Sequence, residues 1–384
     1  MKRIITLILL LFLLSCPVFA AEPNVAAIGA ALIDGKTGRM LWEKNGESPL
    51  AMASTTKIMT AILVLERENL EDTTIISRTA AAQPEVHMDL KEGEEWQMRD
   101  LLSAMMLRSY NDAAVALAEA VSGSVEVFCA EMTEKAAEIG AKDTVFGTPN
   151  GLDSHLSLEE HHSTAYDMAL IAAYALENPT FREIITQPAV SVSDKTGKHV
   201  CEVTNTDRLL REYAGALGVK TGYTNRAGHC FVGAAERDGV RLVSTVLGSG
   251  WGTAGKEKKW TDTKAILDYG FANYVPFEAV RKGTVLKRIP VLESPVESVE
   301  LVLGDSYTAL FSEEEKERLC MKVSVPQKAE APVSAGMQIG MAELWLDEEK
   351  LAEIPLLAKE DAPVFTLGQR LERLSVRWLS WRKF

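Results

Sequence analysis

Two residues of the string ASTTK have the types and the spacing of a nucleophile and its base. Ser54 and Lys57 lie three positions apart, so on a helix the hydroxyl and the amine share one face. A serine hydroxyl is a weak nucleophile at neutral pH, and a lysine that loses its proton through burial and a second nearby cation can activate it. The neighbours Ile58, Ile62 and Leu63 indicate that Lys57 is buried. The alternative is a helix-capping Ser54 with a solvated Lys57.

A second string, SYN at residues 109–111, offers further polar groups. The hydroxyl of Ser109 can relay a proton, and the amide of Asn111 can both donate and accept hydrogen bonds. Alone this string means little, because Asn111 followed by Asp112 is also an ordinary helix start. Whether this string belongs to a catalytic site depends on the other motifs of the chain.

The triplet Lys-Thr-Gly occurs three times, and its neighbours separate the copies. The copies at 36–38 and 195–197 lie between short apolar runs, which predicts the tips of two β-hairpins. The third copy, at 220–222, precedes two strand-like runs at 229–235 and 241–247 that an Asp-Gly turn joins. We therefore expect the third copy to lie on or beside a strand, where alternate side chains and backbone amides can face a ligand.

The elements that must hold these residues are mostly helical in the first half of the chain. The spacing of apolar residues predicts helices at 54–65, 112–121 and 125–139. Thr164 and Asp167 predict a capping box that opens a further helix, which we expect to end before Pro179. Strands are expected after it, and from about residue 276 short β runs separated by glycines predict a small β domain.

The order S-x-x-K, S-x-N, K-T-G is found in penicillin-binding proteins and related β-lactamases. The chain closely resembles the low-molecular-mass penicillin-binding proteins, similar to penicillin-binding protein 5, that act as D-alanyl-D-alanine carboxypeptidases. The similarity spans about residues 25–363 and includes the strings ASTTKIMTA, LLSAMMLRSYNDAAVALAEAVSGS, TPNGLD, HHSTAYDMAL, NTDRLL, KTGYTNRAGHC and DYGF. It implies an α/β (α+β) catalytic domain like that of serine β-lactamases and transpeptidases, a small all-β C-terminal domain and a C-terminal amphipathic helix.

The resemblance also implies a role for each site residue. Ser54 would attack the carbonyl between two D-alanines of a peptidoglycan stem peptide and form an acyl-enzyme, which β-lactams would also form. Lys57 would take the hydroxyl proton, Ser109 would pass a proton to the departing amine, and Asn111 would hold Lys57 and the substrate amide. No metal or organic cofactor is implied.

The third Lys-Thr-Gly copy completes the implied site. Lys220 would help to keep Lys57 neutral and, with Thr221, would attract the terminal carboxylate of the peptide. Gly222 would let the backbone approach closely. The backbone amides of Tyr223 and Ser54 would form the oxyanion hole.

Some residues depart from the family pattern or invite another function. Where relatives often have an arginine that holds the substrate carboxylate, Thr206 and Asp207 precede Arg208, so the role of Arg208 is open. Tyr110 stands where glycine is frequent. His155, His161 and His162 do not have the spacing of a helical metal pair, so we interpret them as structural. His87 falls in a segment that faces the active site in relatives, but we interpret it as a residue of a solvated loop. Cys230, on a strand, is expected to be a buried and inert thiol.

Three functions compete at this point. The first is a carboxypeptidase that trims stem pentapeptides, or an endopeptidase that cuts crosslinks with the same residues. The second is a serine β-lactamase, which would need a glutamate that activates the deacylating water; Glu159 and Glu160 fall in the right general region only. The third is a catalytically silent wall-binding protein. The complete set of nucleophile, base and oxyanion donors favours the carboxypeptidase.

Charge and termini set the location that we expect. Residues 1–20 have the form of a secretory signal peptide, and Cys16 loosely resembles a lipoprotein site. Without that segment the formal net charge falls from −13 to −15, and such an acidic surface disfavours nucleic acid. The other four cysteines are scattered and form no zinc motif. We expect a protein secreted across the cytoplasmic membrane.

The expected domains are 21–275 for catalysis, 276–363 for the β-rich domain and 364–384 for a membrane-anchoring helix. In the last segment Leu367, Leu371, Leu374, Trp378 and Trp381 recur at helical spacing. Residues 366–384 carry five positive charges and one negative charge, which predicts attachment to an anionic membrane surface. Packing of this helix on the β domain or on a partner is the alternative.

Overall fold

The computed structural model describes residues 21–381, and it describes side chains as far as residue 375. The expected signal peptide and Cys16 therefore lie outside the described residues. The chain forms two compact units, which divide between Asn273 and Tyr274, two residues before the expected boundary.

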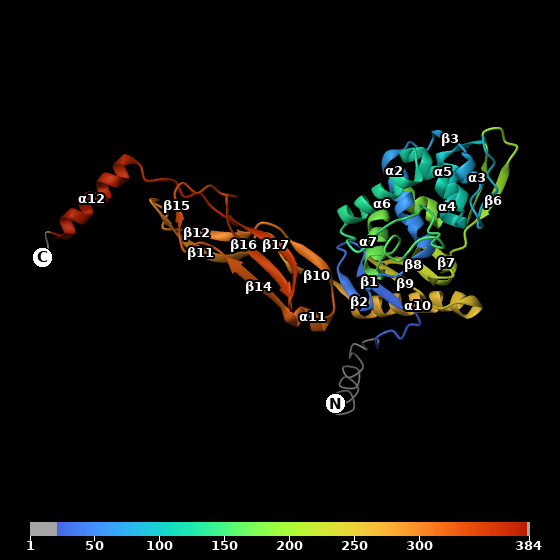
Figure 1. The fold of residues 1–384 in the computed structure, drawn as a ribbon. Coiled ribbons are helices and arrows are strands. Elements are labelled where there is room, and N and C mark those ends of the chain that lie inside the picture. Colours follow the sequence, from blue (N-terminus) through green and yellow to red (C-terminus); the bar gives the residue numbers. More distant parts are fainter. Residues whose placement is uncertain (1–20, 382–384) are drawn as a thin grey trace, which may run out of the picture. The chain divides into compact units, whose positions relative to one another are not determined.

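A five-stranded antiparallel sheet forms the centre of the first unit (Figure 1). Its strand order is β2-β1-β9-β8-β7, so β7 is an edge strand. The bounds are β1 Gly29–Asp34, β2 Met40–Lys44, β7 Ala216–Thr224, β8 Gly228–Arg237 and β9 Val240–Leu247. Nearly every residue of β8 and β9 is buried, which requires cover on both faces of the sheet.

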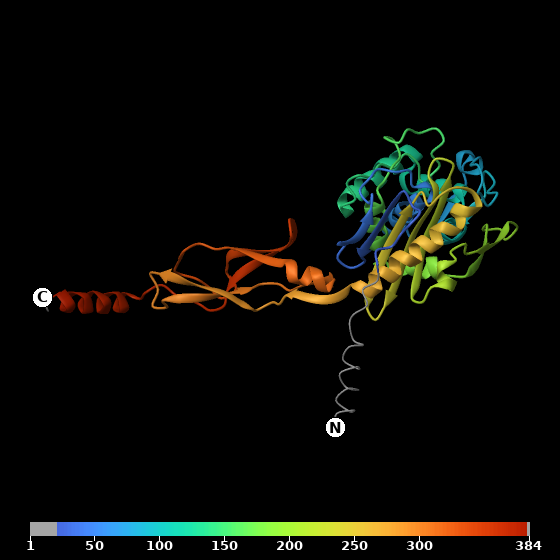
Figure 2. The same ribbon diagram turned by 90° about the horizontal axis from the view of Figure 1, so that it is seen from below.

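Helices supply that cover. The long helix α10 (Gly252–Asn273) lies across one face, as Figure 2 shows, and α2 and α7 lie toward the other. A group of helices next to the face that α2 and α7 cover carries the SYN string, residues 109–111. Its elements and the remaining helices of the unit are α2 Lys57–Arg67, α3 Arg78–Ala81, α4 Met98–Arg108, α5 Asn111–Ser122, α6 Val125–Ile139, α7 Ala165–Ala175, α8 Pro179–Thr186 and α9 Leu209–Glu212.

The three Lys-Thr-Gly copies lie where the sequence predicts. The first is in the turn between β1 and β2, and the second is in the turn between β5 (Ala189–Ser193) and β6 (Val200–Thr204). The third is inside β7. A further hairpin-like pair, β3 (Thr73–Ile75) and β4 (Glu95–Gln97), lies at the edge of the group of helices that carries the SYN string.

Two helix predictions need correction. The helix that begins at Thr164 ends at Ala175 and not at Asn178, and Pro179 opens the separate helix α8 instead of leading into strands. Proline suits the first position of a helix because its missing N–H has no partner there in any case. Thr164 accepts the Asp167 amide as an N-cap, but the Asp167 carboxylate bonds to Asp143 and Thr144, so we find the cap without the reciprocal half of a capping box.

The second unit is built mainly of strands around its own apolar core. Its larger sheet has the order β14-β16-β17-β12-β11-β15, and β10 pairs with β13. Gly340 is one of the glycines expected to separate short β runs, but it lies inside the continuous strand β16, where the register shifts between Gln338 and Gly340. The bounds are β10 Val275–Val280, β11 Val285–Leu292, β12 Ser298–Leu303, β13 Tyr307–Phe311, α11 Glu313–Arg318, β14 Leu319–Ser324, β15 Ala329–Glu330, β16 Gln338–Leu346, β17 Glu349–Ala358 and α12 Leu367–Trp381.

The described helices also bear on membrane spanning. Between residues 21 and 381 no single helix is long and apolar enough to cross a membrane, and α5 with α6 meets the criteria only as a pair bent by 84°.

Candidate active site

A short 3₁₀ helix, η1 (Ala53–Thr56), carries the first site residue and runs directly into α2. In a 3₁₀ turn residues three apart are eclipsed, so Ser54 and Lys57 face each other. The Lys57 Nζ atom lies 3.0 Å from the Ser54 Oγ atom. The helix predicted from residue 54 is therefore a 3₁₀ turn followed by an α-helix, and the change of helix type positions the pair.

Buried contacts hold η1 in place. The Thr56 hydroxyl donates to the Ala53 carbonyl at 2.8 Å. Because His161 Nδ1 accepts the Gly147 amide, its Nε2 carries the ring proton and donates to the Thr56 hydroxyl at 3.3 Å. His161 therefore has a structural role, and burial lowers its pKa to about 4, which keeps the ring neutral.

Lys57 is fully buried, yet its amine has three oxygen neighbours. Besides the Ser54 Oγ atom these are the Asn111 Oδ1 atom at 2.9 Å and the Asn150 carbonyl oxygen at 2.6 Å. Burial and the charge of Lys220 hold the pKa of Lys57 well below its ordinary value, against the opposing effect of Asp112. An amine in this state is available as a base.

Asn111 and Ser109 come from the junction of α4 and α5. Ser109 ends α4 in the left-handed conformation, with φ of 71°, and Asn111 is the first residue of α5. The Asn111 Nδ2 atom donates to the Pro84 carbonyl at 3.1 Å, which fixes the amide with Oδ1 toward Lys57. The Asp112 carboxylate accepts the Met88 amide at 3.0 Å, so α5 also anchors the loop that contains Pro84.

The edge strand β7 lies against η1. A side chain at Gly222 would place its Cβ atom 2.9 Å from the Ser54 amide nitrogen and 3.1 Å from that of Thr55. Glycine is therefore required for the approach of the two backbones. Tyr223 follows on the strand and is 44% exposed, and its ring centre lies 4.4 Å from that of His229.

Buried charges surround the third Lys-Thr-Gly copy. Lys220 is 2% exposed, and its Nζ atom donates to the Thr221 carbonyl at 3.0 Å. Burial, together with the neighbouring charge of Lys259, lowers the pKa of Lys220 to about 7, while Asp207 opposes the shift. Burial in turn raises the pKa of Asp207 to about 6 and lowers that of Lys259 to about 8.

One cleft of about 710 Å³ connects most of the predicted site residues. It exposes Ser54, while Lys57 and Lys220 lie behind its walls. The other predicted site residues that line it are Ser109, Asn111, Thr221, Gly222 and Tyr223. All eight residues that the sequence singles out therefore lie at this cleft or directly behind it, and they come from η1, α2, the α4–α5 junction and β7.

The remaining candidates do not join them as catalytic groups. Arg208 lines the cleft, but its guanidinium is 2.8 Å from carboxylates of Glu212 and Glu257. Tyr110 is buried and faces the Cys201 thiol at 3.8 Å. Cys230 is fully buried, and burial raises the pKa of its thiol to about 12, which leaves it unreactive.

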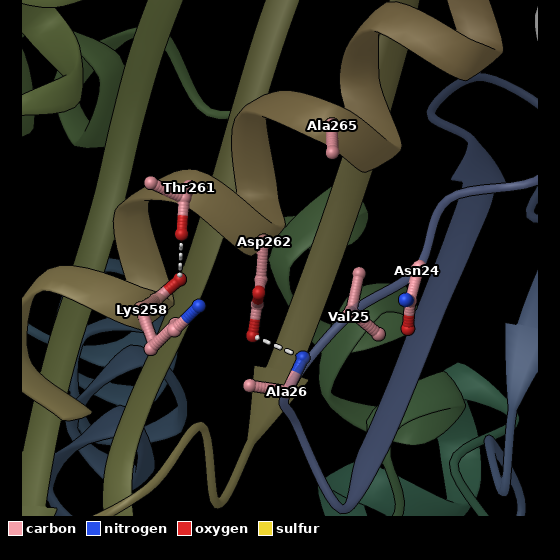
Figure 3. A pocket seen from close by; sticks show the side chains of 7 residues that line it. All are labelled: Asn24, Val25, Ala26, Lys258, Thr261, Asp262 and Ala265. Carbon is pink, nitrogen blue, oxygen red and sulfur yellow. Dashed lines mark hydrogen bonds between the residues drawn. The ribbon is translucent and has the colours of Figure 1, made fainter. Parts of the chain in front are cut away.

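A smaller hollow of about 390 Å³ lies beside α10 and the start of the described chain (Figure 3). Its buried carboxylate, Asp262, accepts the backbone amides of Ala26 and Ala27 at 3.1 and 3.0 Å and thereby fastens that segment to α10. Asp262 therefore has a structural role. Within residues 21–381 no group of three or more His, Cys, Asp or Glu residues could hold a metal ion.

Two contributors to the site escape sequence reasoning. Asn150 holds Lys57 through its backbone carbonyl, and a backbone contact leaves no side-chain pattern in the sequence. The one nearby signal in the sequence is the glycine of the TPNGLD string, Gly151, which has a positive φ of 85°. Lys259 lies on α10, a helix that the apolar spacing does not predict because Lys259, Asp262 and Thr263 occupy its buried face.

Known proteins are similar to this chain in sequence and in fold. Residues 17–250 match the family described as D-alanyl-D-alanine carboxypeptidase, and residues 274–363 match the C-terminal domain of penicillin-binding protein 5. The chain is 32% identical to the D-alanyl-D-alanine carboxypeptidase DacF of Bacillus subtilis over 93% of this chain and 91% of that protein. The crystal structure of penicillin-binding protein 5 from Haemophilus influenzae is 26% identical, covers 90% of this chain and 99% of its own, and gives a TM-score of 0.73.

Proposed function

This chain belongs to the D-alanyl-D-alanine carboxypeptidase family of low-molecular-mass penicillin-binding proteins, and we propose that Ser54 is the nucleophile of its reaction. It is a serine-type carboxypeptidase, a hydrolase that removes the terminal D-alanine from peptidoglycan stem peptides and that penicillin inhibits.

Acylation begins when neutral Lys57 takes the proton of Ser54. The Oγ atom attacks the carbonyl carbon between the two D-alanines, and the oxyanion that forms accepts hydrogen bonds from the backbone amides of Ser54 and Tyr223. The carbon–nitrogen bond then breaks. Ser109 passes the proton from Lys57 to the departing amine, and the acyl chain remains on Ser54.

Deacylation uses the same groups with water in place of the amine. Lys57 takes a proton from water, the hydroxide attacks the ester, and Ser54 leaves with the proton that Lys57 returns. Lys220 and Thr221 attract the terminal carboxylate of the peptide before the first step. Asn111 holds Lys57 and the substrate amide throughout.

One observation supports this proposal above the others: the Lys57 amine lies 3.0 Å from the Ser54 hydroxyl in a fully buried position where the charge of Lys220 disfavours protonation. A lysine that merely stabilises the fold would not be expected there, because burial of an unpaired ammonium is costly. The contact favours an enzyme over a silent wall-binding protein.

The β-lactamase alternative finds no comparable support. Glu160 is exposed and accepts the amide of Ser157, and Glu159 is also exposed. Among the described residues that line the cleft, Glu85 is the one carboxylate. An endopeptidase that cuts crosslinks would use the same site residues, so it differs from the carboxypeptidase in substrate and not in mechanism.

The test compares the parent enzyme with Ser54→Ala. Both are incubated with a pentapeptide that ends in D-Ala-D-Ala, and free D-alanine is measured. We expect release by the parent alone and a penicilloyl adduct, detected by intact mass, on the parent alone. Equal release from both proteins would remove Ser54 from the mechanism, and rapid turnover of penicillin by the parent would favour the β-lactamase.

We also place the chain on the outer side of the cytoplasmic membrane, where its substrate lies, with the C-terminal helix at the membrane surface. The described part of α12 supports this attachment, because Leu367, Leu371 and Leu374 are 75%, 59% and 62% exposed at helical spacing. Five basic residues in 366–384 add attraction to anionic lipids.

A further inference from the structure

The cleft that exposes Ser54 has a strong excess of positive charge. Five basic residues and one acidic residue line it, although the whole chain contains 54 acidic and 41 basic residues. The basic residues are Arg108, Arg208, Arg211, Lys256 and Lys259. This excess is therefore a local property of the cleft and opposes the composition of the chain, and such a surface concentrates anionic ligands.

Two of the five cations are already paired or buried. Arg208 forms ion pairs with Glu212 and Glu257, so its charge is largely neutralised. Lys259 is only 6% exposed, with its amine 4.8 Å from the centre of the Trp260 ring. Neither offers a free charge at the cleft surface.

The other three cations are exposed and lack a counterion. In the described part of the chain, Arg108, Arg211 and Lys256 form no ion pair with a carboxylate within 4.0 Å. They come from three elements, the end of α4, α9 and the first turns of α10. Separate elements of the fold thus bring three unpaired positive charges to one cleft.

The terminal carboxylate of the substrate does not account for these charges. In the proposed function that carboxylate is attracted by Lys220 and Thr221, on β7, and it carries a single charge. Three further cations exceed what one carboxylate can neutralise. A second anionic group on the same peptide would complete the charge balance of the cleft.

We propose that Arg108, Arg211 and Lys256 attract a second carboxylate of the substrate, so that the enzyme prefers peptides whose residue before D-Ala-D-Ala has a free carboxylate on its side chain. This inference rests on the proposed function, because it concerns the same cleft. Glu85 also lines the cleft, and its negative charge weakens the attraction for a carboxylate. If the charge of Glu85 were dominant, the cleft would favour a cationic side chain. The three unpaired cations outnumber this one carboxylate, which predicts that it is not dominant.

The test uses three acetylated tripeptides, acetyl-X-D-Ala-D-Ala, in which X is glutamate, glutamine or lysine. Glutamate and glutamine have nearly the same shape, so the ratio of their kcat/KM values measures charge recognition. We expect glutamate to exceed glutamine by about fivefold to tenfold at low salt, since each exposed ion pair contributes up to about fivefold. Lysine should be the poorest of the three. The ratio should fall toward one in 1 M NaCl, where the Debye length is about 3 Å.

Charge-removing variants assign the preference to the three residues. Arg211→Gln with Lys256→Gln, and separately Arg108→Gln, should each lower the glutamate-to-glutamine ratio, and the triple variant should bring it within about twofold of one. Lys258→Gln is the matched control, because Lys258 is exposed on the same helix as Lys256 but lines the hollow of Figure 3 instead of this cleft. The control should retain the parent ratio. The ratio does not depend on the fraction of active enzyme, so partial misfolding cannot imitate the result.

Several outcomes would overturn the inference. Equal kcat/KM for glutamate and glutamine, a preference for lysine, or an unchanged ratio in the triple variant would each do so and would leave the proposed function intact. Absence of cleavage of all three peptides, together with absence of penicillin acylation at Ser54, would overturn the proposed function as well.

Discussion

At the residue scale, the candidate site contains buried lysines whose pKa values lie below the ordinary value. Lys57 and Lys220 are 0% and 2% exposed, and the charge of Lys220 lowers the pKa of Lys57. Lys259 lowers the pKa of Lys220 in the same way, and Asp207 raises it. A residue outside the three motifs therefore helps to set the pH at which the motif residues function.

The pH dependence of the reaction tests this arrangement. In the proposed function Lys220 must be charged to attract the substrate carboxylate, so we expect kcat/KM to fall as the pH rises through about 7. Lys259→Met removes a cation that lowers the pKa of Lys220, so the basic limb should move to higher pH. Asp207→Asn removes a carboxylate that raises the pKa, so the limb should move to lower pH. The measurement is the pH profile of D-alanine release, and shifts of both variants in one direction would contradict the assignment.

Sequence reasoning identifies the residues of this site better than their partners. The spacing of Ser54 and Lys57 suffices to predict their contact because one helical turn creates it. The contact of Lys57 with Asn150 spans 93 residues and involves a backbone oxygen, so no local pattern contains it. Lys259 and Asp207 are likewise brought to Lys220 only by the packing of α10 and the segment before α9 on the sheet.

At the element scale, the decisive contact is that of η1 with the edge strand β7. The predicted strand at the third Lys-Thr-Gly copy is confirmed, and the signal for it is the hairpin that follows the copy. The predicted helices α5 and α6 are also confirmed, because their apolar residues follow the helical period. The helices α8 and α10 are missed for identifiable reasons: a proline that starts a helix resembles one that stops it, and polar residues occupy the buried face of α10. The contact between η1 and β7 depends on tertiary packing, so no local sequence pattern predicts it.

The glycines of the second and third Lys-Thr-Gly copies form a matched pair of tests for this contact. Gly222→Ala would place a Cβ atom 2.9 Å from the Ser54 amide, so the strand must shift and the oxyanion donors with it. We expect penicillin acylation to slow by roughly 10²–10³-fold, the usual effect of losing one such donor. The measurement is the rate of adduct formation by intact mass.

The matching change is Gly197→Ala in the second copy. Its φ is 69°, and the new Cβ atom would have no neighbour within 4 Å. We expect a loss of about 1 kcal/mol in the free energy of unfolding and an unchanged acylation rate. If both variants acylate equally, the close approach of η1 and β7 is not needed for the reaction.

At the scale of the whole molecule, the chain combines an acidic body with a basic C-terminal segment. Residues 366–384 carry five positive charges and one negative charge in a chain of net charge −13, and the described leucines of α12 are exposed. The sequence alone predicts a basic amphipathic helix in this segment, because both the charge and the apolar spacing are local features. That local pattern does not specify whether the helix contacts lipid or protein.

Deletion of residues 366–384 separates attachment from catalysis. We expect the truncated protein to release D-alanine from a soluble pentapeptide like the parent and to lose binding to vesicles that contain phosphatidylglycerol. Leu371→Asp with Leu374→Asp should weaken sedimentation with the same vesicles by at least about tenfold, because two apolar contacts are lost and two negative charges are added. Unchanged sedimentation of the truncated protein would refute the anchor.

The three oxygen neighbours of Lys57 also dictate the direction in which its proton acceptor points. A neutral amine has two N–H groups and one lone pair. The Asn150 carbonyl and the Asn111 Oδ1 atom can only accept, and the bond from Asn111 Nδ2 to Pro84 prevents that amide from turning over. Both N–H groups are therefore committed, and the lone pair is left facing the Ser54 hydroxyl, the one neighbour with a hydrogen to give.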